Sequence, residues 1–142
     1  MTRLVLPVVT LLLSAPAPAA DLRLGLIGTD TSHVIAFTRA FNGPPGPDHV
    51  DGARVVAAFK GGSPDVEASS SRVDGFAREL QAEWNVEFVD DIASLCPRVD
   101  ALLLESVDGR QHLEQFKELA VGKPVYIDKP LTTTSSASAT SR

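Results

Sequence analysis

The sequence predicts an α/β fold in which a doubly wound parallel sheet forms a single domain. Two patterns indicate this. Short apolar runs without strict polar alternation, typical of strands buried on both faces, recur along the chain. Between them lie amphipathic stretches whose apolar residues are three or four positions apart, as on one face of a helix. Strands and helices that alternate at this spacing form β-α-β units, and their parallel sheet carries helices on both faces.

Five apolar runs are predicted as strands. They cover residues 22–28, 54–59, 86–89, 99–104 and 124–127. Between the first helix and the second strand, residues 42–52 contain three prolines and three glycines, so this segment is predicted as a surface loop. His49 lies in that loop and is expected to be exposed.

Four helical segments are predicted between the strands. The first starts at Ser32, and the others cover residues 73–84, 92–95 and about 111–121. Thr31 or Ser32 can cap the first segment, and Asp90 or Asp91 can cap the third. The last helix is expected to stop at Gly122. Its predicted inward side chains are Leu113, Phe116 and Ala120.

Residues 1–19 are interpreted as a cleaved secretory signal peptide. Arg3 gives a basic start, residues 4–13 are nearly all apolar, and Ala17-Pro18-Ala19 offers the small residues that a signal peptidase needs. An apolar run of about ten residues is too short to span a membrane as a helix. We therefore expect a secreted or periplasmic protein without membrane contact after cleavage, with an uncleaved anchor as the alternative.

The mature chain is expected to consist of one domain, residues 20–131, and a disordered tail, residues 132–142. The tail is rich in Ser, Thr and Ala and has no apolar stripe. The formal net charge of −5 gives no electrostatic reason to expect binding to nucleic acid. Cys96 is the single cysteine, and its apolar surroundings favour a buried packing role over a reactive thiol.

Ligands of open parallel sheets bind beyond the carboxyl ends of the strands, so candidate site residues are sought there. Gly28 ends the first strand just before a helix start, where a Rossmann domain has its phosphate-binding glycines. In the G-x-G-x-x-G pattern, however, Asp30 takes the second glycine position and His33 the third. Asp30 brings bulk and negative charge to the place of a pyrophosphate. A capped helix start without a dinucleotide role is therefore an equal alternative.

Two segments make the chain resemble the N-terminal NAD(P)-binding Rossmann domain of the Gfo/Idh/MocA (glucose–fructose oxidoreductase/inositol dehydrogenase) family. They are residues 24–28 (LGLIG) and residues 122–130 (GKPVYIDKP). The family ends this domain with Glu-Lys-Pro after a strand, and here Asp128 replaces the glutamate. The likeness covers about residues 22–131. It implies hydride transfer between NAD or NADP and a sugar, cyclitol or similar polyol.

The resemblance also implies roles for individual residues. Lys129 would be catalytic, lying near the nicotinamide and polarising the substrate hydroxyl or moving its proton, and Pro130 would fix the turn. Lys60 at the end of the second strand, with Ser63 and Arg72 nearby in the sequence, suits a 2′-phosphate and favours NADP over NAD, with a solvated loop as the alternative. The expected cofactor-binding residues are Gly28, Thr29, Asp30, Thr31, Ser32, Lys60, Ser63, Glu105, Asp128 and Pro130.

The histidines give further candidates. His33 and His112 each lie near a helix start and are expected to face the cleft as substrate-binding residues. No metal site is predicted, because no two histidines have the spacing of metal ligands. Glu105 ends a buried strand, so it either points into the cleft or makes a capping hydrogen bond.

Members of this family carry a second α/β domain, which supplies most of the substrate pocket and usually the interface of a homo-oligomer. The sequence has no such domain after Leu131, so we expect no meaningful turnover from this chain alone. Two alternatives stand beside the oxidoreductase. One is an exported, non-catalytic ligand-binding module with a degenerate Rossmann fold, and the other is a marginally folded fragment without function.

Overall fold

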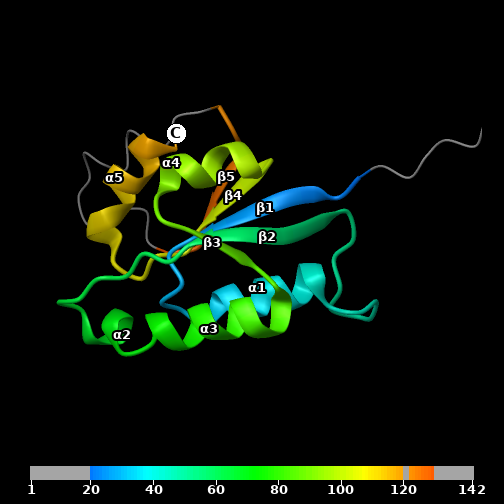
Figure 1. Cartoon of the computed structure of the whole chain (residues 1–142), viewed down its shortest axis with the longest axis horizontal. Helices are drawn as coiled ribbons and strands as arrows, with labels where there is room; N and C mark the ends of the chain where they lie inside the picture. Colours follow the sequence, from blue (N-terminus) through cyan, green and yellow to red (C-terminus); the bar gives the residue numbers. More distant parts are fainter. Residues whose placement is uncertain (1–19, 120–121, 130–142) are drawn as a thin grey trace, which may run out of the picture.

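The strands form one all-parallel sheet with helices on both faces, in a computed structural model that describes residues 20–119 and 122–129 (Figure 1). Their spatial order is β3-β2-β1-β4-β5. The bounds are β1 Leu22–Ile27, β2 Ala53–Phe59, β3 Glu87–Val89, β4 Ala101–Leu104 and β5 Val125–Ile127. The chain winds outward in one direction from β1 to β3 and in the other from β4 to β5, so the switch point lies between β1 and β4. The predicted doubly wound, Rossmann-like fold is confirmed.

The helices cover the two faces of the sheet as the alternation predicted. Helices α1 (His33–Asn42), α2 (Glu67–Ser70) and α3 (Val73–Trp84) lie on one side, and α4 (Ile92–Leu95) and α5 (Gly109–Glu118) lie on the other (Figure 1). A 3₁₀ turn, Cys96–Arg98, follows α4 directly. The sequence did not predict α2 or this turn, because segments of three or four residues carry no helical periodicity.

Consecutive residues of the central strand point into two separate cores. Leu26 packs with Val34 and Leu80 under α1 and α3, whereas Ile27 packs with residues such as Leu95 on the opposite face. Leu26 and Ile27 are both fully buried. A strand buried on both faces can be apolar at every position, which is why β1 shows no polar alternation.

The starts of two elements differ from the prediction by two residues. The fourth strand begins at Ala101 and not at Val99, because Val99 still closes the 3₁₀ turn. Helix α5 begins two residues earlier than predicted, at Gly109, because the Asp108 carboxylate caps it by accepting from the Arg110 amide at 3.0 Å. The inward side chains were also predicted wrongly. Leu113 and Phe116 are only partly buried, and the buried positions are His112, Gln115 and Leu119.

The capping alternatives left open by the sequence are now decided. The Thr31 hydroxyl accepts from the His33 amide at 3.3 Å, while Ser32 makes no capping hydrogen bond through its side chain. Asp91 caps α4 by accepting from the Ser94 amide at 2.6 Å.

Two single-residue expectations have different outcomes. Cys96 is buried as predicted, and burial raises the pKa of its thiol. His49 is half-buried and not exposed, and its Nε2 lies 3.0 Å from an Asp51 carboxylate oxygen.

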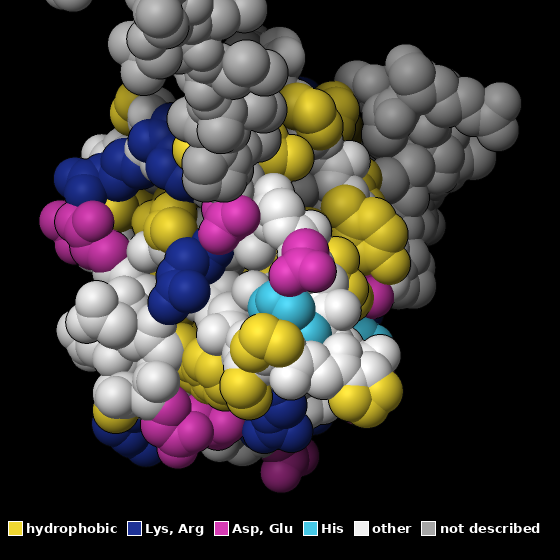
Figure 2. All heavy atoms as spheres, turned by 90° about the vertical axis from the view of Figure 1, so that its right-hand side faces the viewer, with side chains coloured by type: hydrophobic (Ala, Val, Ile, Leu, Met, Phe, Trp, Pro, Cys, Tyr) yellow, Lys and Arg dark blue, Asp and Glu magenta, His cyan; other side chains and the backbone are white. Residues whose placement is uncertain are grey.

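The surface shows no strongly charged area on the face seen in Figure 2, where side chains of both signs alternate with apolar ones. Within residues 20–119 and 122–129, no helix has the length and apolar character to cross a membrane. The predicted signal peptide, the predicted tail, Ala120 and Pro130 lie outside the described residues.

Gly28 is expected to be far less replaceable than other glycines with positive φ. Its φ is +81°, and a Cβ there would lie 2.7 Å from the backbone of Ser106. Gly52 has a similar φ of +86°, yet a Cβ would meet nothing within 4 Å. Both Gly→Ala changes strain the backbone, but only Gly28→Ala adds a clash, which costs about 1–3 kcal/mol more. Urea unfolding of both variants measures the difference, and equal losses would show that the close approach is unimportant.

Candidate functional site

Three loops meet at the carboxyl ends of the central strands. Gly28 follows β1 and touches Ser106 after β4, and a Cβ at Gly61, after β2, would lie 3.1 Å from the Gly28 Cα. Gly61 itself has a φ of +62°, which favours glycine. This stacking of loops determines where every candidate side chain near the switch point can lie.

The backbone of the first loop is tied to the second strand. The Gly28 amide donates to the Phe59 carbonyl at 3.0 Å, and the Thr29 amide donates to the Lys60 carbonyl at 2.8 Å. The Thr29 hydroxyl donates to the same Lys60 carbonyl at 3.2 Å. The backbone amides of Gly28 and Thr29 are therefore not free to donate to a phosphate. The exposed start of α1 at Ser32 is the part of this loop that can receive one.

Asp30 is turned into the protein. It is 1% exposed, and its Oδ1 accepts from the Val107 amide at 3.1 Å, which links the loop after β1 to the loop after β4. Its Oδ2 is buried without a hydrogen-bond partner. Asp30 thus brings a buried negative charge to the switch point, while its bulk lies between the two loops.

Four side chains gather across the switch point from distant parts of the sequence. The Asp128 Oδ2 lies 2.6 Å from the His33 Nδ1, and the Lys129 Nζ lies 2.9 Å from that same nitrogen. Lys129 also donates to the Asp128 Oδ2. A carboxylate oxygen of Glu105, at the end of β4, lies within 4.8 Å of the His33 and Asp128 atoms. The structure thus brings together four of the residues that the sequence analysis singled out as site candidates.

The His33 Nδ1 cannot form both of its hydrogen bonds at once, because it donates to Asp128 only when protonated and accepts from Lys129 only when unprotonated. A proton on the His33 Nδ1 can be donated to Asp128, and the nitrogen then has no lone pair for Lys129. Without that proton, the nitrogen accepts from the Lys129 ammonium. Asp128 accepts in either case, so Lys129 and His33 can exchange a proton while the carboxylate stays paired.

The two carboxyl groups of the cluster are shifted in opposite directions. Burial, together with the negative charge of Asp128, raises the pKa of Glu105 to about 8. Burial acts in the same direction on Asp128, but hydrogen bonds from Lys129 and His33 outweigh it and leave the pKa of Asp128 below its usual value. A carboxylic acid and a carboxylate are therefore neighbours near neutral pH.

Ser63 and Lys60 do not form the predicted phosphate pocket. Ser63 is 1% exposed, and its hydroxyl donates to the Asp108 Oδ2 at 2.7 Å. The same hydroxyl accepts from the side-chain Nε2 of Gln111 at 2.6 Å. Lys60 is exposed, but its Nζ pairs with Asp74 at 2.9 Å. The prediction for Ser63 is wrong because its hydroxyl is used to hold the loop after β2 against α5. The choice between NAD and NADP therefore stays a prediction that rests on the exposed cations Lys60 and Arg72.

This contact between the loop and α5 is reinforced by charge. The Arg110 guanidinium bridges Asp65 at 2.8 Å and Asp108 at 2.7 Å. Hydrogen bonds from Arg110 hold the pKa of Asp108 well below its usual range. The end of β2 and the start of α5 are thus fixed relative to each other.

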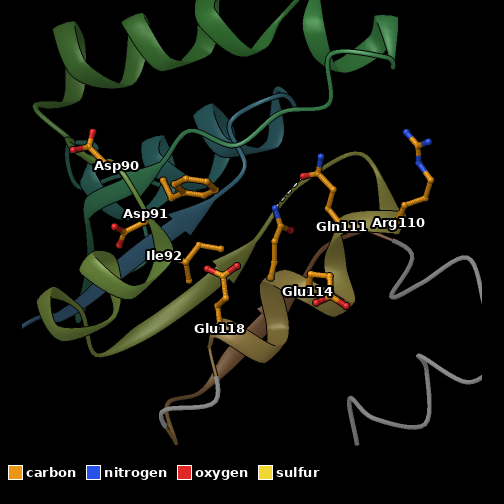
Figure 3. A pocket seen from close by; sticks show the side chains of 9 residues that line it. Asp90, Asp91, Ile92, Arg110, Gln111, Glu114 and Glu118 are labelled. Atoms are coloured by element: carbon orange, nitrogen blue, oxygen red, sulfur yellow. Dashed lines mark hydrogen bonds between the residues drawn. The ribbon is translucent and has the colours of Figure 1, made fainter.

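A hollow of about 490 Å³ lies between α4 and α5, beside this contact (Figure 3). Its apolar floor includes Phe59 and Ile92, and Gln111 and Gln115 are joined at 3.2 Å on its α5 side. The charged lining residues are Asp90, Asp91, Arg110, Glu114 and Glu118. Because carboxylates outnumber the one cation, the hollow suits a neutral or cationic group better than a phosphate.

His112 does not face the cleft. It is 1% exposed, and its Nε2 lies 2.7 Å from the Ser106 carbonyl oxygen, where it can donate a hydrogen bond. The prediction of a substrate-binding role is wrong because the ring lies on the buried side of α5. It supports the Ser106 backbone that touches Gly28.

No family model and no curated protein matches the chain, whereas many solved structures do. A dehydrogenase (MviM) from Clostridium difficile matches with 24% identity and a TM-score of 0.58, over 82% of this chain and 33% of that one. A myo-inositol dehydrogenase from Lactobacillus casei, in complex with NAD(H) and myo-inositol, matches with 26% identity and a TM-score of 0.56, over 84% and 32%. Biliverdin reductase from Synechocystis sp. PCC 6803, in complex with biliverdin and NADP+, matches with 17% identity and a TM-score of 0.62, over 84% and 33%.

The chain spans about a third of the length of these structures. The likeness shows the Rossmann-like fold. Its structural neighbours are dehydrogenases of the Gfo/Idh/MocA type, and the resemblance stated from residues 24–28 and 122–130 is confirmed in this respect.

Sequence reasoning missed the residues that join the loops. Ser106 and Val107 act through the backbone, which leaves no pattern in the side chains. Asp108 could have been found, because an aspartate directly before Gly109 and a helical stretch is a typical N-cap. Gln111 has no such signal, since its partner Ser63 is far away in the sequence.

Replacing Glu105 should remove a pH dependence of stability. Between the ordinary pKa of 4.5 and the folded value of about 8, the native state keeps a proton that the unfolded chain has released. Stability from this group therefore falls as pH rises through that window, by up to about 1.4 kcal/mol per pH unit. Glu105→Gln does not titrate, so its stability should fall less between pH 5 and pH 8.

Urea unfolding at pH 5 and pH 8, with EDTA present, measures this difference between the variant and the parent chain. The control is Glu83→Gln, which changes an exposed carboxylate on α3 and should leave the pH dependence of the parent chain in place. Identical pH dependence in Glu105→Gln and the parent would contradict the buried acid.

Proposed function

We propose that the chain is the nucleotide-binding domain of an exported NAD(P)-dependent oxidoreductase that transfers hydride to or from a sugar, cyclitol or similar polyol. The observation that carries this is the gathering of His33, Asp128 and Lys129 at the switch point of a Rossmann-like sheet. Open α/β sheets bind their ligands at this point. The likeness to a myo-inositol dehydrogenase with bound NAD(H) supports the substrate class.

The cofactor fits the chain through the start of α1. Ser32 is exposed and its side chain caps nothing, so its hydroxyl is free to bind a phosphate at a helix N-terminus. The nicotinamide, when bound, supplies the hydride donor or acceptor. NAD and NADP both remain candidates, because Lys60 is paired with Asp74 and Ser63 is buried.

The role of this chain in the chemistry falls to Lys129. Its Nζ can donate a hydrogen bond to a substrate hydroxyl oxygen. After giving a proton to the His33 Nδ1, it can also take the hydroxyl proton when hydride leaves the same carbon. Asp128 holds the ammonium in place, and His33 is placed to pass the proton on towards solvent because half of its side chain is exposed. Turnover would also need a pocket that holds the substrate against the nicotinamide. The part of the matched structures that this chain covers is about a third of their length.

Export is part of the proposal and is supported by the residue pattern of 1–19. Expression of the full chain in a bacterium with a periplasm, followed by intact mass measurement of the periplasmic fraction, tests it. We expect a chain that begins at Ala20, and recovery of an uncleaved chain from the cytoplasm would contradict export.

Dinucleotide binding is the first test of the proposed function. Calorimetric titration of residues 20–142 with NADH and, separately, with NADPH should give a dissociation constant in the micromolar range for at least one of the two dinucleotides. Ser32→Glu places a carboxylate at the start of α1 and should weaken that binding about tenfold or more through repulsion.

Ala82→Glu is the matched control, because it adds the same charge to an exposed position near the C-terminal end of α3. It should leave binding unchanged. A sample that unfolds cooperatively but binds neither dinucleotide would contradict the oxidoreductase. The non-catalytic binding module would then replace it, favoured by the buried charge of Asp30 and by the paired amides of Gly28 and Thr29.

A further inference from the structure

Three atoms of the kinds that ligate metals converge at the switch point. They are the His33 Nδ1 and one carboxylate oxygen each from Glu105 and Asp128, and all lie within 4.8 Å of one another. The residues come from the start of α1 and the ends of β4 and β5, so the sheet itself brings them together. Ligand atoms around a tetrahedral Zn²⁺ ion are about 3.3 Å apart. The His33 Nδ1 and the Asp128 Oδ2 are 2.6 Å apart, and the His33 side chain is 52% exposed, so it has room to shift around an ion.

Glu105 supplies a separate indication. It is completely buried, and neither carboxylate oxygen has a hydrogen-bond partner among the described residues. A buried polar group without a partner is costly and needs an explanation. Because one of these oxygens faces the His33 and Asp128 atoms, a cation between the three groups would satisfy it.

A positive charge already lies against two of the three groups. The Lys129 ammonium contacts the Asp128 Oδ2 and lies 2.9 Å from the His33 Nδ1. These are the atoms that a metal ion would bind. Lys129 does not satisfy Glu105, whose oxygens stay unpartnered. The ammonium therefore balances the charge of Asp128 but leaves the Glu105 carboxyl group without a hydrogen-bond partner.

We propose that His33, Glu105 and Asp128 form a binding site for a divalent metal ion of the Zn²⁺ type, and that Lys129 competes with the ion for His33 and Asp128. One imidazole nitrogen and two carboxylate oxygens suit Zn²⁺ or Co²⁺, whereas Mg²⁺ and Ca²⁺ prefer oxygen ligands alone. Three protein ligands leave a coordination position open to a water molecule or a substrate oxygen. The site does not depend on the proposed nucleotide binding.

The competition makes a prediction that a merely adventitious histidine site would not meet. Lys129→Met removes the ammonium and leaves the negative charge of Asp128 without its partner. It should therefore raise the affinity for the ion at least tenfold. His33→Gln and Glu105→Gln each remove a ligand and should lower the affinity at least tenfold.

The experiment is a titration of untagged residues 20–142 with Co²⁺, monitored by visible absorption. Zn²⁺ is then added to displace the bound Co²⁺. No nucleotide is present in either step. We expect one ion per chain, bound more weakly by the two ligand variants and more tightly by Lys129→Met. His49→Gln is the control, because His49 is half-buried beside Asp51 in a different loop and should not affect binding.

Three results would overturn the site: unchanged affinity in His33→Gln and Glu105→Gln, loss of affinity in His49→Gln, or no gain in Lys129→Met. The first would leave Glu105 as a buried acid with a structural role only. Since no nucleotide is present, failure of this test leaves the dinucleotide titration untouched, and failure of that titration leaves this site untouched.

Discussion

The close approach of Gly28 to Ser106 is the constraint on which the rest of the site depends. It stacks the loop after β1 on the loop after β4, and Gly61 places the loop after β2 against the same glycine. The Asp30–Val107 hydrogen bond then joins the first two loops, and buried His112 supports the Ser106 carbonyl from below. With these loops fixed, the end of β4 presents Glu105 towards α1. The position of the Glu105 carboxyl group is thus determined by contacts between the loops and not by a partner of its own.

Several carboxyl oxygens at the switch point lack hydrogen-bond partners. Asp128 is paired with Lys129 and His33, whereas Glu105 and one oxygen of Asp30 are buried without hydrogen-bond partners. An ordinary protein core avoids such groups, because each costs the free energy of losing its water. The fold can keep them because β1 and β4 are buried on both faces and hold the loops rigidly. Strained or unsatisfied groups of this kind concentrate where ligands bind.

The fold could be predicted from the sequence because strands such as β1 and β4 reveal burial on both faces through their composition alone. Lys129, Asp128 and His33 could also be predicted as neighbours, since the ends of parallel strands meet at one edge. Ser63 and His112 were predicted wrongly for one reason. Their burial depends on a partner outside the local pattern, Asp108 for Ser63 and the Ser106 backbone for His112, and neither apolar spacing nor a motif records such a partner.

Asp30 shows how the structure changes an objection that the sequence raised. At the second glycine position of a dinucleotide motif, an aspartate should exclude a pyrophosphate by its bulk and by its charge. The Asp30 side chain does not occupy the space at the start of α1, because it is buried and accepts a hydrogen bond from the Val107 amide. The charge is only partly balanced, because the Oδ2 has no hydrogen-bond partner. The negative charge of Asp30, and not its size, therefore opposes the binding of a phosphate at Ser32. A cation at the switch point would offset this charge and favour the binding of an anion.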